Sequence, residues 1–300
     1  MLAGMNVHGD GRVPASDLAS AGVKVARMVL YPNIDLRPII QNYANSGIDS
    51  LLLIARESHG GEMGETFDAN VAQKWIKEYA YRYGSFPGVR WQWGNETDHV
   101  SPSSWSLDRH DFEWGLQEMR KTIGPRAYLV TGGLVSGDPS YLDGVDLSSV
   151  NAISVHPYGQ APDGGDWNGL PGNFGQVGTL LARYRAYHPH IVVSEIGVST
   201  NECSEQMQAR YCTAMMKALD ALGFVDFACW FCWEDSMVDG FGVRYKPAYT
   251  AYRDFCRSMA NQPVDWRVRC LTVAAKVKAT KVGQMNTKWK AEILKMLMAP

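Results

Sequence analysis

The chain has 300 residues, of which 46% are hydrophobic and 20% are charged, so it can bury a large core as one large domain or two small ones. Its formal net charge of -2 argues against a nucleic-acid partner, because binding to phosphates requires clustered positive charge. No uncharged apolar run reaches the roughly 18 residues that span a bilayer, so we expect no membrane partner.

Short apolar runs alternate with longer amphipathic stretches, a pattern typical of β/α units around a parallel sheet. The apolar runs, which we predict to be strands, are residues 2–7, 23–30, 50–55, 89–93, 127–131, 152–155, 191–194 and 227–233. The stretches with apolar residues at three- and four-residue spacing, which we predict to be helices, are residues 34–46, 70–82, 106–123, 175–187, 205–222 and 248–259. Eight strand and helix pairs in about 260 residues favour an α/β fold of the (β/α)8 TIM barrel type over a doubly wound sheet.

The repeating pattern ends after residue 259. From residue 261 onward the chain holds eight Lys and Arg against two acidic residues. We therefore predict a barrel over residues 1–262 and a short basic C-terminal extension over residues 263–300. Apolar side chains within residues 288–298 fall on one face of a helix, so we expect the extension to be helical and to pack on the barrel. The alternative is a segment that binds a partner or mediates oligomerisation, and the oligomeric state stays open.

Two features bear on the compartment of the protein. The N-terminus shows no basic stretch followed by an apolar segment, so no signal peptide is visible. The six cysteines all fall in the last third without the density of a disulfide scaffold, which favours reduced thiols. Cys229 and Cys232 form a CxxC motif, but strand alternation sends their side chains to opposite faces, which argues against a metal or redox site. The localisation stays open between a cytoplasmic protein, one released by lysis or carried on a larger particle, and a secreted one whose leader was removed.

Polar residues that close two predicted strands carry the chemistry, because reactive residues of a (β/α)8 barrel lie at the carboxyl ends of the strands. The fourth predicted strand ends in Asn95-Glu96, and the seventh ends in Glu195. A single glutamate at a strand end is more often a solvated loop residue or an ion-pair partner. Strands four and seven, however, face each other across a closed barrel, so the two glutamates can meet above the core. Hydrolysis of a glycosidic bond with retention needs two carboxyl groups roughly 5 to 5.5 Å apart, and this pair can supply them.

The motifs around these glutamates resemble those of clan A of the glycoside hydrolases, most closely families 39 and 5. Asn95-Glu96, in WGNETD, is similar to the Asn-Glu pair that closes strand four in that clan, and Glu195, in VVSEIG, is similar to the glutamate that closes strand seven. The likeness covers residues 1 to about 262 and departs at Thr97, where the clan often has proline. It implies that Glu96 is the acid/base and Glu195 the nucleophile of a retaining enzyme, with no metal and no organic cofactor.

The resemblance extends to polar residues at other strand ends. Arg27, in VKVARMVLYP, resembles the clan's arginine that hydrogen-bonds the nucleophile, and a nearby guanidinium lowers the pKa of a carboxylate. His156 and Tyr158, in ISVHPYG, resemble the histidine and tyrosine beside the two carboxylates. Asn95 is expected to hold the 2-hydroxyl of the reacting sugar. The sequence leaves open whether four polar residues near the early strand ends line the sugar pocket or cap loops: Asn6, His8, Glu57 and His59.

Three of the ten tryptophans are candidates for stacking against sugar rings. Trp230, in FACWFCWED, resembles the clan's aromatic platform beneath the reacting sugar. Trp233 is a second candidate in the same run, although strand parity would not turn both side chains inward. Trp167, in the Gly- and Pro-rich loop APDGGDWNGLPGNFG, is the candidate for a subsite outside the reactive one.

These features together predict a retaining β-glycoside hydrolase with a carbohydrate substrate. A barrel of this size has short loops that leave little material to enclose a pocket, so we expect an open groove and endo-action on a β-glycan of the glucan, mannan or xylan type. The alternatives are an exo-glycosidase or transglycosylase of the same clan, and a non-catalytic or particle-associated carbohydrate-binding barrel.

Overall fold

The computed structural model describes residues 1–63, 66–99 and 105–260. The chain divides into two compact units, Met1–Arg257 and Ser258–Pro300. The predicted boundary at residue 262 and the predicted helix at residues 288–298 lie outside the described residues, so both stay predictions.

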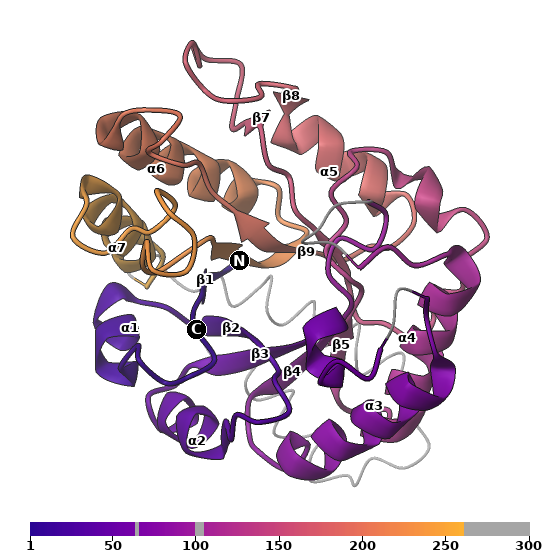
Figure 1. Ribbon diagram of the computed structural model, residues 1–300. Helices are drawn as coiled ribbons and strands as arrows, with labels where there is room; N and C mark the ends of the chain where they lie inside the picture. The colour runs from indigo at the N-terminus through magenta and orange to yellow at the C-terminus, as the bar shows by residue number, and fades with distance from the viewer. Residues whose placement is uncertain (64–65, 100–104, 261–300) are drawn as a thin grey trace, which may run out of the picture. The chain divides into compact units, whose positions relative to one another are not determined.

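The first unit is a (β/α)8 barrel (Figure 1). Its eight parallel strands are β1 (Leu2–Asn6), β2 (Val25–Val29), β3 (Asp49–Ile54), β4 (Val89–Trp93), β5 (Tyr128–Val130), β6 (Ile153–Val155), β9 (Ile191–Ile196) and β10 (Val225–Trp230). They hydrogen-bond in the order β5-β4-β3-β2-β1-β10-β9-β6, and a bridge from Val130 to Ala152 brings β5 next to β6. Each of the eight predicted runs overlaps one of these strands, so the predicted fold class is confirmed.

The helices lie outside the ring of strands (Figure 1). They are α1 (Ala15–Ala21), α2 (Arg37–Asn45), α3 (Ala69–Tyr83), α4 (Arg109–Ile123), α5 (Val177–Arg185), α6 (Glu205–Ala221) and α7 (Pro247–Ala260). The six helix ranges predicted above each correspond to one of these helices, whereas no range was predicted for the short α1. Side-chain caps begin α3, α4 and α6, where Asp68, Asp108 and Ser204 each accept backbone N–H groups of the first turn. Within the described residues, no helix is long and apolar enough to cross a membrane.

The connection between β5 and β6 departs from the eight strand and helix pairs that we expected. It contains only a 3-10 turn, η2 (Pro139–Leu142), in place of an α-helix. Four glycines and one proline occur among residues 131–151, and both residue types disfavour a helix interior. A second 3-10 turn, η1 (Arg56–His59), follows β3, and two short strands, β7 (Gln160–Ala161) and β8 (Gly175–Gln176), form a separate pair after β6.

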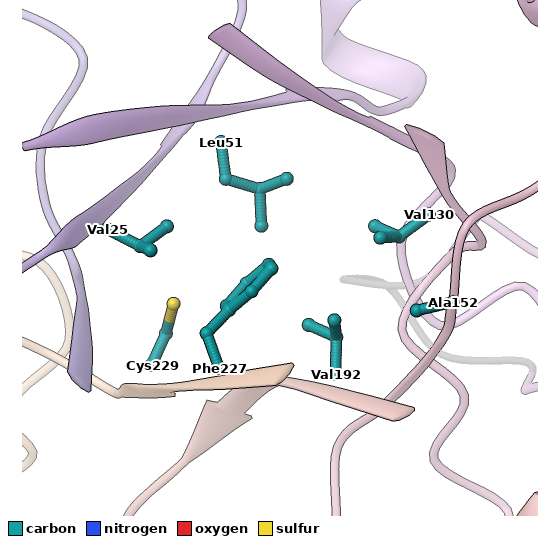
Figure 2. Close-up of a cluster of buried hydrophobic side chains, with 7 residues drawn as sticks. All are labelled: Val25, Leu51, Val130, Ala152, Val192, Phe227 and Cys229. Atoms are coloured by element: carbon teal, nitrogen blue, oxygen red, sulfur yellow. The ribbon is translucent and has the colours of Figure 1, made fainter. Parts of the chain in front are cut away.

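An apolar layer fills the interior of the barrel. Figure 2 shows its side chains pointing from the surrounding strands toward one another. The layer consists of Val25, Leu51, Val130, Ala152, Val192, Phe227 and Cys229. Burying a side chain of the size of Phe227 contributes about 1.5–3 kcal/mol, so this layer is a major source of stability. Because side chains alternate along a strand, the residues two positions further along point into the barrel again, closer to its mouth.

Candidate active site

A buried polar network lies directly above the apolar layer. Arg27, two residues after Val25, donates from Nε to Gln92 Oε1 at 2.7 Å and from Nη1 to Asn6 Oδ1 at 2.8 Å. The amide of Gln92 in turn donates to Ser194 Oγ at 3.0 Å. All four residues are buried, and these hydrogen bonds keep the guanidinium in one orientation. A positive charge is therefore held near the barrel axis, with its remaining N–H groups directed to the mouth.

Glu195, in β9, accepts hydrogen bonds from two side chains at the mouth. Arg27 Nη1 donates to Glu195 Oε1, and the hydroxyl of Tyr158 donates to Oε2 at 2.9 Å. Burial by itself raises the pKa of this carboxyl group, but the charges of His156 and Arg27 and the two hydrogen bonds outweigh it, so that the pKa is lowered. Burial and the adjacent Glu195 raise the pKa of Tyr158 well above its ordinary value, which keeps the hydroxyl a donor. Glu195 is consequently held as an anion.

Glu96 reaches the same place from the loop that follows β4. Its backbone has φ 51°, in the left-handed region, and Gly94 just before it has φ 84°. His156 Nδ1 lies 3.4 Å from Glu96 Oε1, and His156 Nε2 lies 2.9 Å from Ser194 Oγ. Gly133 leaves room for this histidine, because a Cβ atom at position 133 would lie 1.9 Å from His156 Nε2.

The two glutamates approach each other closely. A carboxylate oxygen of Glu96, one of Glu195 and a ring nitrogen of His156 all lie within 4.8 Å of one another. By distance alone these three groups could also bind a metal ion, but the guanidinium of Arg27 against Glu195 opposes a second cation there. The arrangement is better suited to proton transfer and nucleophilic attack.

Six of the predicted site residues thus converge on one spot at the mouth of the barrel. Besides the five side chains already placed, Asn95 accepts a hydrogen bond from Arg27 Nη2 at 2.8 Å. Asn6, whose role the sequence left open, belongs to the network, and it also donates to the backbone oxygen of Ser194 at 2.9 Å. The strand parity that places Arg27 inward would also have identified Gln92 and Ser194 as inward polar residues.

The structure buries the side chains of Trp230 and Trp233 against helices, which corrects the expectation that they form a sugar platform. Trp230 has an exposed fraction of 0%, and its ring centroid lies 6.1 Å from that of Tyr211 in α6. Trp233 is 2% exposed and packs against Tyr249 of α7 at 5.7 Å. Cys229, the neighbour of Trp230, points into the barrel, so alternation turns Trp230 outward to the helices.

Trp167 is also buried rather than available for stacking. Its exposed fraction is 4%, its ring packs against Tyr211 at 5.9 Å, and Arg210 lies over the ring at 4.4 Å. Its indole N–H donates to Asp163 Oδ1 at 2.9 Å within the same loop. The residue therefore fastens the loop after β6 to α6 and does not present an open aromatic face.

Two phenylalanines that the sequence analysis missed lie beside Tyr158. The ring centroids of Phe231 and Phe241 lie 6.5 Å and 6.2 Å from that of Tyr158, and 5.6 Å from each other. Both side chains are partly exposed, in contrast to Trp230. Phe231 has the same strand parity as Cys229, so the alternation of the run FACWFCW is the signal that could have identified it.

Comparison with known proteins gives structural neighbours only, since no family profile and no curated protein matches the sequence. A family 39 glycoside hydrolase from Bacteroides cellulosilyticus WH2 has a TM-score of 0.65 at 16% identity over 86% of this chain and 64% of that protein, so the chain spans less than two thirds of its length. A GH5-4 broad-specificity endoglucanase from Clostridium longisporum has a TM-score of 0.62 at 12% identity, covering 86% and 96% of the two chains. A GH128 endo-β-1,3-glucanase from Amycolatopsis mediterranei has a TM-score of 0.59 at 17% identity, covering 84% of this chain and 98% of that protein. These likenesses establish the fold, and families 39 and 5, to which the motifs pointed, are both among the neighbours.

Proposed function

We propose that the protein is a retaining β-glycoside hydrolase in which Glu195 is the nucleophile and Glu96 the acid/base. The observation that carries this proposal is the approach of the two carboxylates to within 4.8 Å. Retaining enzymes separate the two groups by about 5 to 5.5 Å, whereas inverting enzymes leave about 6.5 to 9.5 Å for a water molecule. The close approach of one oxygen from each carboxylate supports the shorter spacing, and hence retention.

The environments of the two glutamates support unequal roles. Glu195 is buried and ionised, with Arg27 and Tyr158 on its two oxygens, which suits attack on an anomeric carbon. Glu96 has only the imidazole of His156 beside it among the contacts above, and it is more exposed than Glu195. In the first step Glu96 gives its proton to the leaving oxygen, and in the second it takes a proton from the water that attacks the covalent intermediate.

We propose endo-action on an extended β-glycan, since the short loops of a barrel of this size leave little material to enclose a pocket. The loop after β6 is held against α6 by the contact of Arg210 with the ring of Trp167. In Figure 1 it projects past α5 and α6, away from the ring of strands. We propose a polysaccharide or oligosaccharide of the glucan, mannan or xylan type as the substrate.

Aryl β-glycosides with different sugars test the activity, with Glu195→Ala as the inactive control. Azide rescue assigns the roles: Glu195→Gly with azide should give the α-glycosyl azide, and Glu96→Ala with azide should give the β form. Exchanged products would mean that the two roles are reversed. If wild type releases no aglycone from any member of the series but binds an oligosaccharide, the protein is a non-catalytic carbohydrate-binding barrel. Product lengths from β-glycans then separate endo-action from exo-action or transglycosylation.

A further inference from the structure

Asp98, two residues after Glu96, fastens the loop of Glu96 to a neighbouring connection. The backbone N–H of Val135 donates to Asp98 Oδ1 at 3.0 Å and to Oδ2 at 3.2 Å, and the N–H of Ser136 donates to Oδ2 at 3.0 Å. Asp98 is partly buried, and hydrogen bonds to an ionised carboxylate are stronger than neutral ones. The contact spans 37 positions of sequence, so it joins two connections that local structure would leave independent.

The segment that Asp98 holds is itself locked to β6. Leu134 N donates to Ser154 O at 3.0 Å, and His156 N donates to Leu134 O at 2.8 Å. His156 is the residue whose Nδ1 lies 3.4 Å from Glu96. Together with the bridge between Asn95 and Gly133, Asp98 therefore links the loop of Glu96, through the connection after β5, to the histidine beside Glu96.

The loop of Glu96 needs such an anchor. A left-handed backbone in a residue with a side chain costs of the order of 1–2 kcal/mol, so Glu96 keeps φ 51° only if its surroundings hold it. The backbone bonds from Trp105 to Asn95 O and from Leu107 to Thr97 O join the loop to itself. The contacts of Asp98 tie the part of the loop that follows Glu96 to the connection after β5.

We propose that Asp98 is a positioning residue for Glu96, holding its carboxyl group at the leaving oxygen during proton transfer. This inference rests on the proposed function. It gives Asp98, in the Thr-Asp sequence that follows Glu96, a role in positioning that carboxyl group, which the sequence alone does not indicate. The competing explanation is that Asp98 stabilises the fold alone, as Asp138 does when it accepts the N–H of Ser140 in η2.

Two substrates with the same sugar separate the explanations. A phenyl β-glycoside has a poor leaving group that must be protonated as the bond breaks, whereas a 2,4-dinitrophenyl β-glycoside does not require protonation. Asp98→Ala should lower kcat/KM about 10- to 100-fold for the phenyl substrate and less than about twofold for the dinitrophenyl substrate. Asp98→Asn, which keeps one acceptor oxygen, should fall between Asp98→Ala and wild type.

Asp138→Ala is the matched control, because it removes an aspartate that caps the same connection without touching the loop of Glu96. Equal losses on both substrates for Asp98→Ala, or an equal effect of Asp138→Ala, would overturn the proposal. If Asp98→Ala does not fold, the leaving-group dependence of Asp98→Asn decides in its place. Amide exchange at Val135 and Ser136 gives a readout independent of activity: slow exchange in wild type with no turnover of either substrate would refute the proposed function and leave the tether intact.

Discussion

The hydroxyl of Tyr158 offers a quantitative test of the charge state of Glu195. Tyr158→Phe removes a single donor, the O–H that lies 2.9 Å from Glu195 Oε2, and leaves Arg27 in place. A hydrogen bond to a charged group contributes about 1.5–3 kcal/mol, and one pKa unit corresponds to 1.36 kcal/mol. Because this bond stabilises the anion, its loss raises the pKa of Glu195 by about one to two units.

The pH profile of kcat/KM reports this change through its acidic limb. Below its pKa Glu195 is protonated and cannot attack, so a raised pKa moves the acidic limb to higher pH. Tyr187→Phe is the matched control, since its hydroxyl also donates to a carboxylate, Asp143 Oδ1 at 2.6 Å, at an exposed position outside the site. The assay is hydrolysis of an aryl β-glycoside between pH 3 and 8, roughly the range in which carboxyl groups and histidines titrate. An acidic limb that stays in place or moves to lower pH in Tyr158→Phe would refute the assignment of Glu195 as the anionic nucleophile.

Two further pairs of substitutions examine how the site is supported. Gly133→Ala places a Cβ atom 1.9 Å from His156 Nε2, so we expect a loss of about 1–3 kcal/mol in the free energy of unfolding and a fall in kcat/KM. Gly164→Ala is the control and should change neither quantity, because the nearest atom to its Cβ lies 3.4 Å away. Chemical denaturation measures the first effect and steady-state kinetics the second. Trp230→Ala should lower the free energy of unfolding by about 3–5 kcal/mol and leave the KM for an oligosaccharide unchanged, because its ring packs between the barrel and α6. Phe231→Ala should raise the KM for the oligosaccharide and have little effect on the free energy of unfolding. If Trp230→Ala raises KM and Phe231→Ala does not, Trp230 is the sugar platform after all.

Most of the fold could be predicted from local patterns in the sequence. Eight apolar runs separated by amphipathic stretches specified the barrel, because strand and helix periodicities are properties of consecutive residues. The connection after β5 was the exception. Eight regular strand and helix pairs predict a helix there, but Gly132, Gly133 and Pro139 argue against one.

The aromatic residues show where a motif was a weaker guide than alternation. Trp230 was chosen because tryptophan resembles the platform of the clan, yet its neighbour Phe231 has the inward parity and the contact with Tyr158. The residue type points to Trp230 as the platform, whereas strand alternation points to Phe231. For Trp167 no local pattern could decide, since its burial depends on Tyr211 and Arg210 of a helix more than 40 residues away.

The sequence by itself determined which polar residues close the strands, because a carboxylate that follows an apolar run is visible in consecutive residues. Glu96 and Glu195 could therefore be named as the candidate catalytic pair. Only the tertiary structure decided how these residues act on one another. The approach of the two glutamates, the clamp of Arg27 and Tyr158 on Glu195, and the tether from Asp98 to the connection after β5 join different strands and loops. Such contacts form only when the barrel closes, because closure brings together segments that are far apart in the sequence. No local pattern of residues records them.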